Sequence, residues 1–161
     1  MNLARYLKEE RIDLELDATF PLPADEDQAH PATVESVAER MCDLLTRSEA
    51  IVNETKLRLD LVNRERRTAS LLGNGLFLPH VRTLQARRLV MAVGVSAAGL
   101  PLGAEDGEPV RLVIALVGPT YDDKAYLQVY KRLSEKLSDE DSVNAVLQAE
   151  RAGEVVRALS G

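Results

Sequence analysis

Two segments in the second half of the chain are apolar at almost every position, and no other feature constrains the fold as strongly. They are RLVMAVGVS at residues 88–96 and PVRLVIALVGP at residues 109–119, and both are rich in β-branched side chains. A strand covered on one face alternates apolar and polar residues, whereas a strand covered on both faces is apolar throughout. We therefore expect two inner strands of a sheet that carries helices on both faces.

Helical periodicity before these strands supplies candidates for one outer layer. From Thr33, apolar residues recur at steps of three and four, namely Val34, Val37, Ala38, Met41, Leu44 and Leu45. A second helix is predicted over residues 54–65, after an Asn53 cap. A short helix, LARYLKEE, is predicted to open the chain behind an Asn2 cap.

The C-terminal part of the chain is also predicted to be helical. A helix is expected to begin at Asp122 or Asp123 and to carry an apolar stripe made of Tyr126, Leu127, Tyr130, Leu133 and Leu137. Two short helices, around residues 139–149 and 153–159, are expected to close the chain. Residues 97–108 between the two apolar segments are rich in turn-forming residues and predict a loop.

A strict alternation of apolar and acidic residues over positions 12–18 predicts a half-buried edge strand. Residues 19–32 contain three prolines and several acids without periodicity, so we expect a surface loop in which His30 is exposed. Together these elements predict an α/β fold with a mixed central sheet sandwiched between helices on both faces.

Length and composition exclude several classes of protein. A chain of 161 residues is long enough for one sizeable core, so we expect a single domain over residues 1–161. One cysteine, Cys42, and two histidines supply neither an internal disulfide nor the usual four ligands of a structural zinc site. Cys42 flanks the apolar face of its helix and is expected to be a packing residue. We expect no metal and no cofactor.

The net charge of −6 argues against nucleic-acid binding, but positive charge is concentrated in one part of the chain. The basic residues are Arg64, Arg66, Arg67, Arg82, Arg87 and Arg88, and Glu65 is the acid among them. They are either solvated loop side chains or a local positive field for phosphate or for an acidic partner surface. Apolar runs such as Leu112 to Val117 are too short to cross a bilayer, and the charged N-terminus does not resemble a secretory signal, so a cytoplasmic protein is expected.

The basic segment surrounds the sequence GNGLFLPHVR at residues 73–82. Neutral imidazole has one nitrogen with a free lone pair, so His80 can act as a nucleophile. Pro79 restricts the backbone that enters His80, and in an extended segment Arg82 projects to the same side as His80, where its guanidinium offers a planar fork to a phosphoryl group. The glycines allow backbone amides to approach an anion. The spacing matches neither a Walker loop nor a dinucleotide fingerprint, and by itself it favours a structural histidine over a catalytic one.

The residues from 64 to 82 resemble those of a known family. The IIA domains of the fructose and mannitol type in the sugar phosphotransferase system, with their nitrogen-regulatory relative, have an Arg-Glu pair, a hydroxyl residue, Gly-Asn-Gly, an apolar triplet and Pro-His-x-Arg, in this order. The matching residues here are Arg64-Glu65, Ser70, Gly73-Asn74-Gly75, Leu76-Phe77-Leu78 and Pro79-His80-Val81-Arg82. The length of the chain and its order of elements fit the same family.

This resemblance implies a cytoplasmic phosphoryl carrier with a phosphohistidine intermediate. His80 would accept a phosphoryl group from the phosphohistidine of the carrier protein HPr and pass it to a cysteine on a IIB domain. The expected phosphate-binding residues are Arg82, Ser70, Gly73, Asn74, Gly75, Tyr126 and Arg64. Their task would be to position the phosphoryl group and to stabilise an anionic transition state.

The chain departs from the family pattern at several positions. Tyr126 stands where many members have a second histidine, and its phenol can donate a hydrogen bond without becoming cationic. Phe77 replaces a small residue and would either narrow the pocket or pack beneath it. Ser70 replaces a threonine, and the loop at 19–32 is longer than usual.

Three functions remain open at this point. The first is a transport carrier. The second is a stand-alone nitrogen-regulatory protein that controls partner proteins according to its phosphorylation state; Tyr126, and a sequence without a fused membrane, IIB or HPr-like segment, favour this one. The third is a divergent domain that no longer carries phosphate. Because such a domain contacts proteins, the sequence does not specify a sugar.

Overall fold

One mixed sheet of six strands forms the centre of the fold. The computed structural model describes residues 1–161 and orders the strands β1 (Ile12–Asp13), β5 (Val90–Leu100), β6 (Val110–Gly118), β3 (Leu76–Phe77) and β2 (Leu71–Gly73), while β4 (His80–Arg82) also pairs with β6. Strands β5 and β6 are antiparallel, β1 runs parallel to β5, and both β3 and β4 run parallel to β6. The two apolar segments therefore form the central pair, as predicted.

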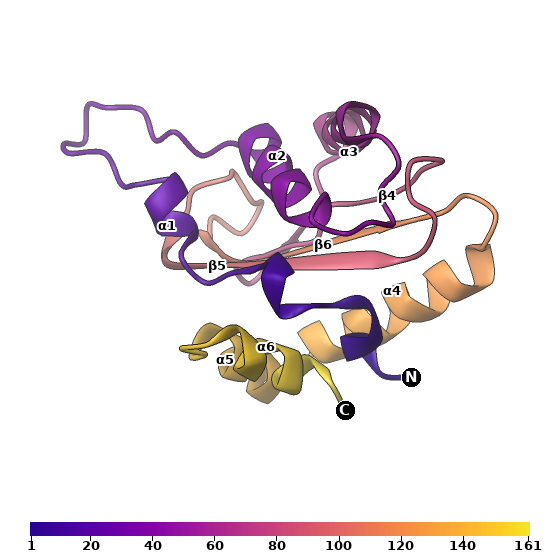
Figure 1. The fold of residues 1–161 in the computed structure, drawn as a ribbon. Helices are drawn as coiled ribbons and strands as arrows, with labels where there is room; N and C mark the ends of the chain where they lie inside the picture. The colour runs from indigo at the N-terminus through magenta and orange to yellow at the C-terminus, as the bar shows by residue number, and fades with distance from the viewer.

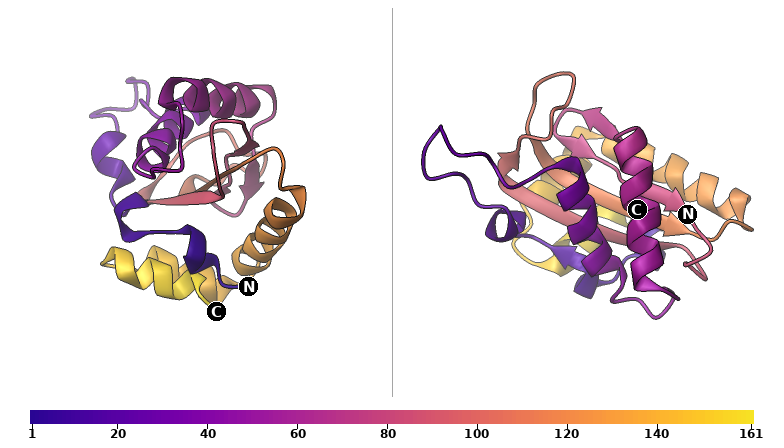
Figure 2. Two further views of the ribbon diagram at one scale, coloured as in Figure 1. Left: turned by 45° about the vertical axis from the view of Figure 1, so that its right-hand side comes forward. Right: turned by 90° about the horizontal axis from the view of Figure 1, so that it is seen from above.

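Helices cover both faces of this sheet. On one face lie α2 (Val34–Leu45) and α3 (Glu54–Arg67), and on the other lie α4 (Asp123–Leu137), α5 (Glu140–Leu147) and α6 (Ala152–Leu159) (Figures 1 and 2). Side chains of β6 alternate between the two hydrophobic cores. Val113 and Val117 pack in the core under α2 and α3, and Leu112 and Leu116 pack in the core over α4 and α6. This double burial explains the missing alternation in the sequence and confirms the predicted α/β sandwich.

The predicted helix starts are confirmed by side-chain caps. Thr33 Oγ1 accepts a hydrogen bond from Ser36 N at 3.0 Å at the start of α2, and Asn53 Oδ1 accepts one from Lys56 N at 3.0 Å at the start of α3. At the start of α4, Asp122 Oδ1 accepts one from Ala125 N at 3.2 Å. Each cap satisfies a backbone N–H that the first helical turn leaves without a partner.

The N-terminal segment differs from the prediction. Its opening helix is a 3₁₀ turn, η1 (Leu3–Tyr6), capped by Asn2 as expected and followed by a second one, η2 (Glu9–Arg11). The predicted strand over 12–18 is wrong beyond Asp13, because the chain turns into a short helix, α1 (Leu16–Thr19). Leu16 packs directly over Gly94 of β5, where a Cβ atom would lie 2.7 Å from its Cδ1. The alternating apolar residues of positions 12–18 fit this turn into α1 as well as a continuous strand, which explains why the strand was predicted too long.

Three smaller predictions also need correction. Leu127 does not belong to the buried stripe of α4, since it is 61% exposed while Val129 is fully buried. Strand β5 continues to Leu100, into the predicted loop. His30 is half-buried and not exposed, and its Nδ1 accepts a hydrogen bond from Ala32 N at 3.0 Å just before α2. Phe20 and Ala32, near the ends of loop 19–32, are buried in the core, and the chain between them projects from the body (Figure 1).

No helix in this structure is long and apolar enough to span a membrane. The structure also contains no group of three or more His, Cys, Asp or Glu side chains that could hold a metal ion.

The single thiol should be inert in the folded protein. Cys42 is fully buried in α2, and burial raises its pKa to about 12. At pH 8 only about one thiol in ten thousand is then ionised, so alkylation should be about a thousandfold slower than for an exposed cysteine. Intact mass after brief treatment with iodoacetamide should show no adduct on the native chain and one adduct in denaturant. Rapid labelling of the native chain would contradict the buried placement.

Candidate active site

The backbone on either side of His80 is held firmly at the edge of the sheet. Leu78 N donates a hydrogen bond to Ser70 O at 3.0 Å, and Pro79 O accepts one from Leu116 N at 3.0 Å. His80 itself pairs with Leu116 in the parallel register of β4 and β6. The segment is extended, as its Pro79 and its sequence predict, and the imidazole has little freedom of direction.

The hydrogen bonds of the His80 ring define its chemical state. Its Nδ1 lies 2.7 Å from the carbonyl oxygen of Leu78. A carbonyl oxygen accepts hydrogen bonds and cannot donate them, so Nδ1 carries the hydrogen and donates it to Leu78. The lone pair is then on Nε2, which lies 3.5 Å from Nη2 of Arg64. On its other side the half-buried ring contacts Tyr130, with ring centroids 5.1 Å apart.

An open hollow of about 570 Å³ extends from His80, and it is lined by Arg64, His80, Val81, Arg82, Thr120, Asp123 and Tyr126. Arg64 comes from α3, His80 and Arg82 from β4, and Asp123 and Tyr126 from α4. Two guanidinium groups therefore lie beside the imidazole. Arg82 forms an ion pair with Asp123 and lies over the Tyr126 ring, with Cζ 5.6 Å from the ring centroid. This arrangement offers positive charge to an anion bound at His80.

Tyr126 lines this hollow and carries a neutral, buried hydroxyl. The residue is 5% exposed and its buried hydroxyl has no hydrogen-bond partner in the protein. Burial raises the pKa of the phenol well above its ordinary value, and the nearby Arg82 and Arg64 offset this only in part. A buried hydroxyl without a partner is costly, so this phenol is an unsatisfied donor next to the hollow.

Behind the imidazole lies a buried carboxylate, Glu65, which the sequence motif includes only as half of the Arg-Glu pair. Glu65 is 1% exposed and accepts hydrogen bonds from Ser70 N at 2.7 Å, from Ser70 Oγ at 3.1 Å and from Arg64 Nη1 at 3.2 Å. Ser70 Oγ in turn lies 3.4 Å from His80 Nδ1. A glutamate at a buried position of an otherwise apolar helix face was the available signal for this network.

The Gly73-Asn74-Gly75 turn does not join the His80 hollow, which corrects its predicted place in the site. Leu76 pairs with Leu112 and His80 pairs with Leu116, so four residues of extended strand, about 13 Å, separate the turn from the imidazole. The turn links β2 to β3 with φ values of 79°, 54° and 78°. The backbone N–H of Asn74 donates a hydrogen bond to Asp106 Oδ2 at 2.7 Å, so the turn already binds a carboxylate of the same chain.

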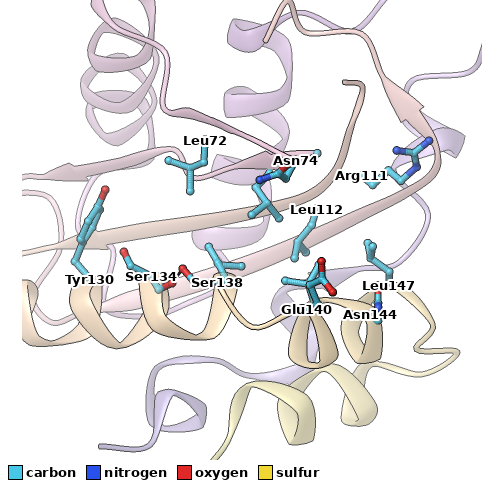
Figure 3. A pocket seen from close by; sticks show the side chains of 14 residues that line it. Leu72, Asn74, Arg111, Leu112, Tyr130, Ser134, Ser138, Glu140, Asn144 and Leu147 are labelled. Carbon is cyan, nitrogen blue, oxygen red and sulfur yellow. Dashed lines mark hydrogen bonds between the residues drawn. The ribbon is translucent and has the colours of Figure 1, made fainter. Parts of the chain in front are cut away.

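A separate cleft of about 740 Å³ lies between the β3 edge of the sheet and helices α4 and α5. Figure 3 shows Tyr130 at one end of this cleft, Asn74 and Leu112 beyond it, and Arg111 at the other end. Tyr130 separates the cleft from His80, because its ring also packs against the imidazole. Phe77 lines neither hollow; it is 1% exposed and packs in the core under α2 and α3, so it does not narrow the site.

Comparison with known proteins finds relatives of this chain among the EIIA proteins of the sugar phosphotransferase system. The profile of the family described as "Phosphoenolpyruvate-dependent sugar phosphotransferase system, EIIA 2" matches residues 26–161. The chain is 31% identical to the PTS system fructose-specific EIIA component of Haloferax volcanii over 121 residues, which cover 74% of this chain and 78% of that protein. Two other curated relatives are much longer, and the chain spans 19% and 32% of their lengths.

Two solved structures superpose on this chain over nearly its whole length and share its fold. The nitrogen regulatory protein IIA-Ntr of Neisseria meningitidis superposes with a TM-score of 0.79 at 22% identity, covering 98% of each chain. The Escherichia coli enzyme IIA for mannitol, solved in a complex with its phosphorylated enzyme IIB, superposes with a TM-score of 0.71 at 21% identity, covering 95% of this chain and 96% of that one.

Proposed function

Since this chain belongs to the EIIA 2 family of the phosphoenolpyruvate-dependent sugar phosphotransferase system, we propose that it carries a phosphoryl group on Nε2 of His80. One observation carries the proposal. The Leu78 carbonyl holds the hydrogen on Nδ1, so the Nε2 lone pair is free at a hollow that Arg64 and Arg82 also line. A core histidine sealed by aliphatic side chains would have neither the open lone pair nor the two cations.

The proposed uptake step is an in-line displacement at phosphorus. The Nε2 lone pair forms a bond to the phosphorus atom of a phosphohistidine on an HPr-like donor, and the P–N bond of the donor breaks with its electron pair returning to the donor ring. His80 keeps its Nδ1 hydrogen, so the phosphorylated ring is formally cationic. In the forward step a thiolate on a IIB domain attacks the phosphorus atom, and the electron pair of the P–N bond returns to Nε2.

The chain assists both steps by positioning and by charge. The transferring phosphoryl group is anionic and loosely bonded in the transition state, so cations and donors held in place around it lower the barrier. Arg64 lies next to Nε2, and Arg82 can exchange Asp123 for phosphoryl oxygens. Tyr126 lines the same hollow, and its buried hydroxyl is a donor without a partner.

A mass measurement tests this proposal. The chain is incubated with phosphoenolpyruvate, the first enzyme of the pathway and HPr, and its intact mass is then measured at neutral pH. We expect a gain of one phosphoryl group that is lost on brief acid treatment, since phosphohistidine is acid-labile. A wild-type chain that gains no mass under conditions that phosphorylate HPr would refute the carrier function.

Tyr126 also favours a second function, a regulator that acts through its phosphorylation state. Its buried, neutral phenol cannot add positive charge to the hollow, and a carrier that holds its phosphoryl group longer suits a signal better than a transport flux. Adding a IIB domain to the phosphorylated chain separates the two functions. A transport carrier should transfer its label to the IIB cysteine within seconds, whereas a dedicated regulator should retain it.

Substitutions at Tyr126 should change the transfer rate in opposite directions. Tyr126→Phe removes a donor to an anionic group and should slow phosphorylation about tenfold, and Tyr126→His adds a group that can become cationic and should raise the rate modestly, about threefold. Tyr121→Phe is the matched control, because Tyr121 is 76% exposed and its hydroxyl donates to Arg87 O. Unchanged rates in both Tyr126 variants would show that the phenol lies away from the phosphoryl group.

A further inference from the structure

Glu65 is the one acidic side chain that is fully buried in this protein. Its side chain has no exposed surface, and the other buried residues of α3 are the apolar Leu57, Leu61 and Val62. A charged carboxylate in the interior costs free energy unless it is paired and hydrogen-bonded, and an apolar residue of similar volume is often at least as stabilising. The position therefore points to a functional contribution.

The partners of Glu65 are the groups that surround the His80 ring. Its Oε2 accepts hydrogen bonds from Arg64 Nη1 at 3.2 Å and from Ser70 Oγ at 3.1 Å. Arg64 uses its other terminal nitrogen, Nη2, to approach His80 Nε2 at 3.5 Å, and Ser70 Oγ lies 3.4 Å from His80 Nδ1. One carboxylate thus holds a side chain next to each ring nitrogen.

The same carboxylate also secures the backbone that orients the ring. Glu65 Oε1 accepts the Ser70 N–H at 2.7 Å, and the Ser70 carbonyl accepts the Leu78 N–H at 3.0 Å. The Leu78 carbonyl then accepts the His80 Nδ1 hydrogen at 2.7 Å. Because the Ser70 hydroxyl donates its hydrogen to Glu65, the lone pairs of Ser70 Oγ are free to face the Nδ1 hydrogen of His80.

We propose that Glu65 is a positioning residue of the phosphoryl-carrier site, whose buried negative charge acts through Ser70 and Arg64 to orient His80 and to stabilise its imidazole ring in the cationic form. The proposal rests on the carrier function proposed above. When Nε2 bonds to phosphorus and Nδ1 keeps its hydrogen, the ring acquires positive charge, and the carboxylate stabilises that charge across the Ser70 hydroxyl.

The other charged and titratable groups around the ring act in different directions. Arg64 of α3 and Arg82 of β4 disfavour a cationic ring, Asp123 at the start of α4 is paired with Arg82, and Tyr126 and Tyr130 of α4 are neutral. Glu65 is linked to Nδ1 through the Ser70 hydroxyl and is shielded from solvent. Removing its charge should therefore make protonation of the ring less favourable.

The first experiment needs no phosphoryl transfer. The ¹⁵N shifts of the His80 ring are followed against pH in the unphosphorylated wild type and in Glu65→Gln, with His30 as internal reference. The midpoint of the pH-dependent change for His80 should move to lower pH in Glu65→Gln, by about one pH unit, while His30 is unaffected. A His80 midpoint within a tenth of a unit of wild type in a folded Glu65→Gln would overturn the proposal.

The second experiment measures transfer from phosphorylated HPr. Glu65→Gln should lower kcat at least tenfold with little change in KM, and Glu54→Gln, which removes an exposed charge from the same helix, should match wild type. A wild-type kcat in Glu65→Gln would contradict the proposal. If wild type takes up no phosphoryl group but the His80 midpoint still shifts in Glu65→Gln, the carrier function is wrong, while the effect of Glu65 on the His80 ring is supported.

Ser70→Ala provides the alternative if Glu65→Gln does not fold. This variant cuts the link between the carboxylate and Nδ1 but leaves the Arg64–Glu65 pair and the backbone hydrogen bonds intact. It should shift the ring midpoint in the same direction and lower kcat severalfold. A Ser70→Ala variant with the wild-type midpoint and the wild-type kcat would overturn the relay through Ser70.

Discussion

His80→Ala should give a folded protein that takes up no phosphoryl group from HPr. The imidazole is half-buried and belongs to neither hydrophobic core, so its removal should change the free energy of unfolding by about 1 kcal/mol or less. The proposed nucleophile, in contrast, has no second imidazole to replace it within the hollow, and the one carboxylate there, Asp123, is paired with Arg82. Intact mass should therefore show the unmodified chain, with the wild-type melting profile.

His30→Ala is the natural control for this result, because the chain has two histidines. His30 lies in the loop before α2 and accepts a hydrogen bond from Ala32 N through its Nδ1. The variant should gain one phosphoryl group at the wild-type rate. An adduct that persists in His80→Ala and disappears in His30→Ala would move the carrier site to the loop and refute the assignment made here.

Arg64→Ala should cause the second largest loss, a decrease of about a hundredfold in the rate of phosphorylation. Arg64 Nη2 lies 3.5 Å from the nitrogen proposed to attack phosphorus, and donors placed where charge develops in a transition state contribute effects of about this size. Arg67→Ala makes the same change of charge at an exposed position of the same helix and should reduce the rate less than threefold. Equal decreases in the phosphorylation rate of the two variants would indicate that the positive charge of this helix matters in general, and not a contact between Arg64 and the phosphoryl group.

Arg64→Ala should also destabilise the fold, because it leaves Glu65 buried without its cation. We expect a decrease of about 2 kcal/mol in the free energy of unfolding, measured by denaturant titration. Arg64→Gln separates the two consequences, since an amide can still donate to Glu65 but cannot neutralise a phosphoryl group. It should recover most of the stability and little of the rate. Recovery of both would assign to Arg64 a purely structural role.

Much of the site could be predicted from local sequence because several of its residues lie on one short extended segment. Pro79 and the flanking apolar residues predicted the direction of His80, and the structure pairs this segment with β6. The error at Gly73–Gly75 has the same origin. The turn was expected at the site because glycine amides can approach an anion, but an extended chain separates its residues by about 3.3 Å each, so the turn lies beyond reach of the imidazole.

The distant members of the site depend on how the layers pack. The periodicity of α4 placed Tyr126 and Tyr130 on one face of the helix, and the family resemblance associated Tyr126 with the phosphate. Neither indicated that Tyr130 packs on the His80 ring. The role of Glu65 was hidden for a related reason. A single glutamate on a helix is usually solvated, and only the approach of Ser70 and the β4 edge excludes water from it.

The sequence by itself determined the architecture, since two strands without polar alternation require cover on both faces and the capped amphipathic segments on either side supply it. It also pointed to His80 as the proposed nucleophile, because residues 64–82 resemble the Pro-His-x-Arg motif of the family and its flanking residues. Only the tertiary structure decided which nitrogen of that ring is free, which cation adjoins it and which carboxylate supports it. Those properties arise from contacts among α3, β4 and α4, and hydrogen bonds between segments distant in the chain form only when both cores close on the sheet.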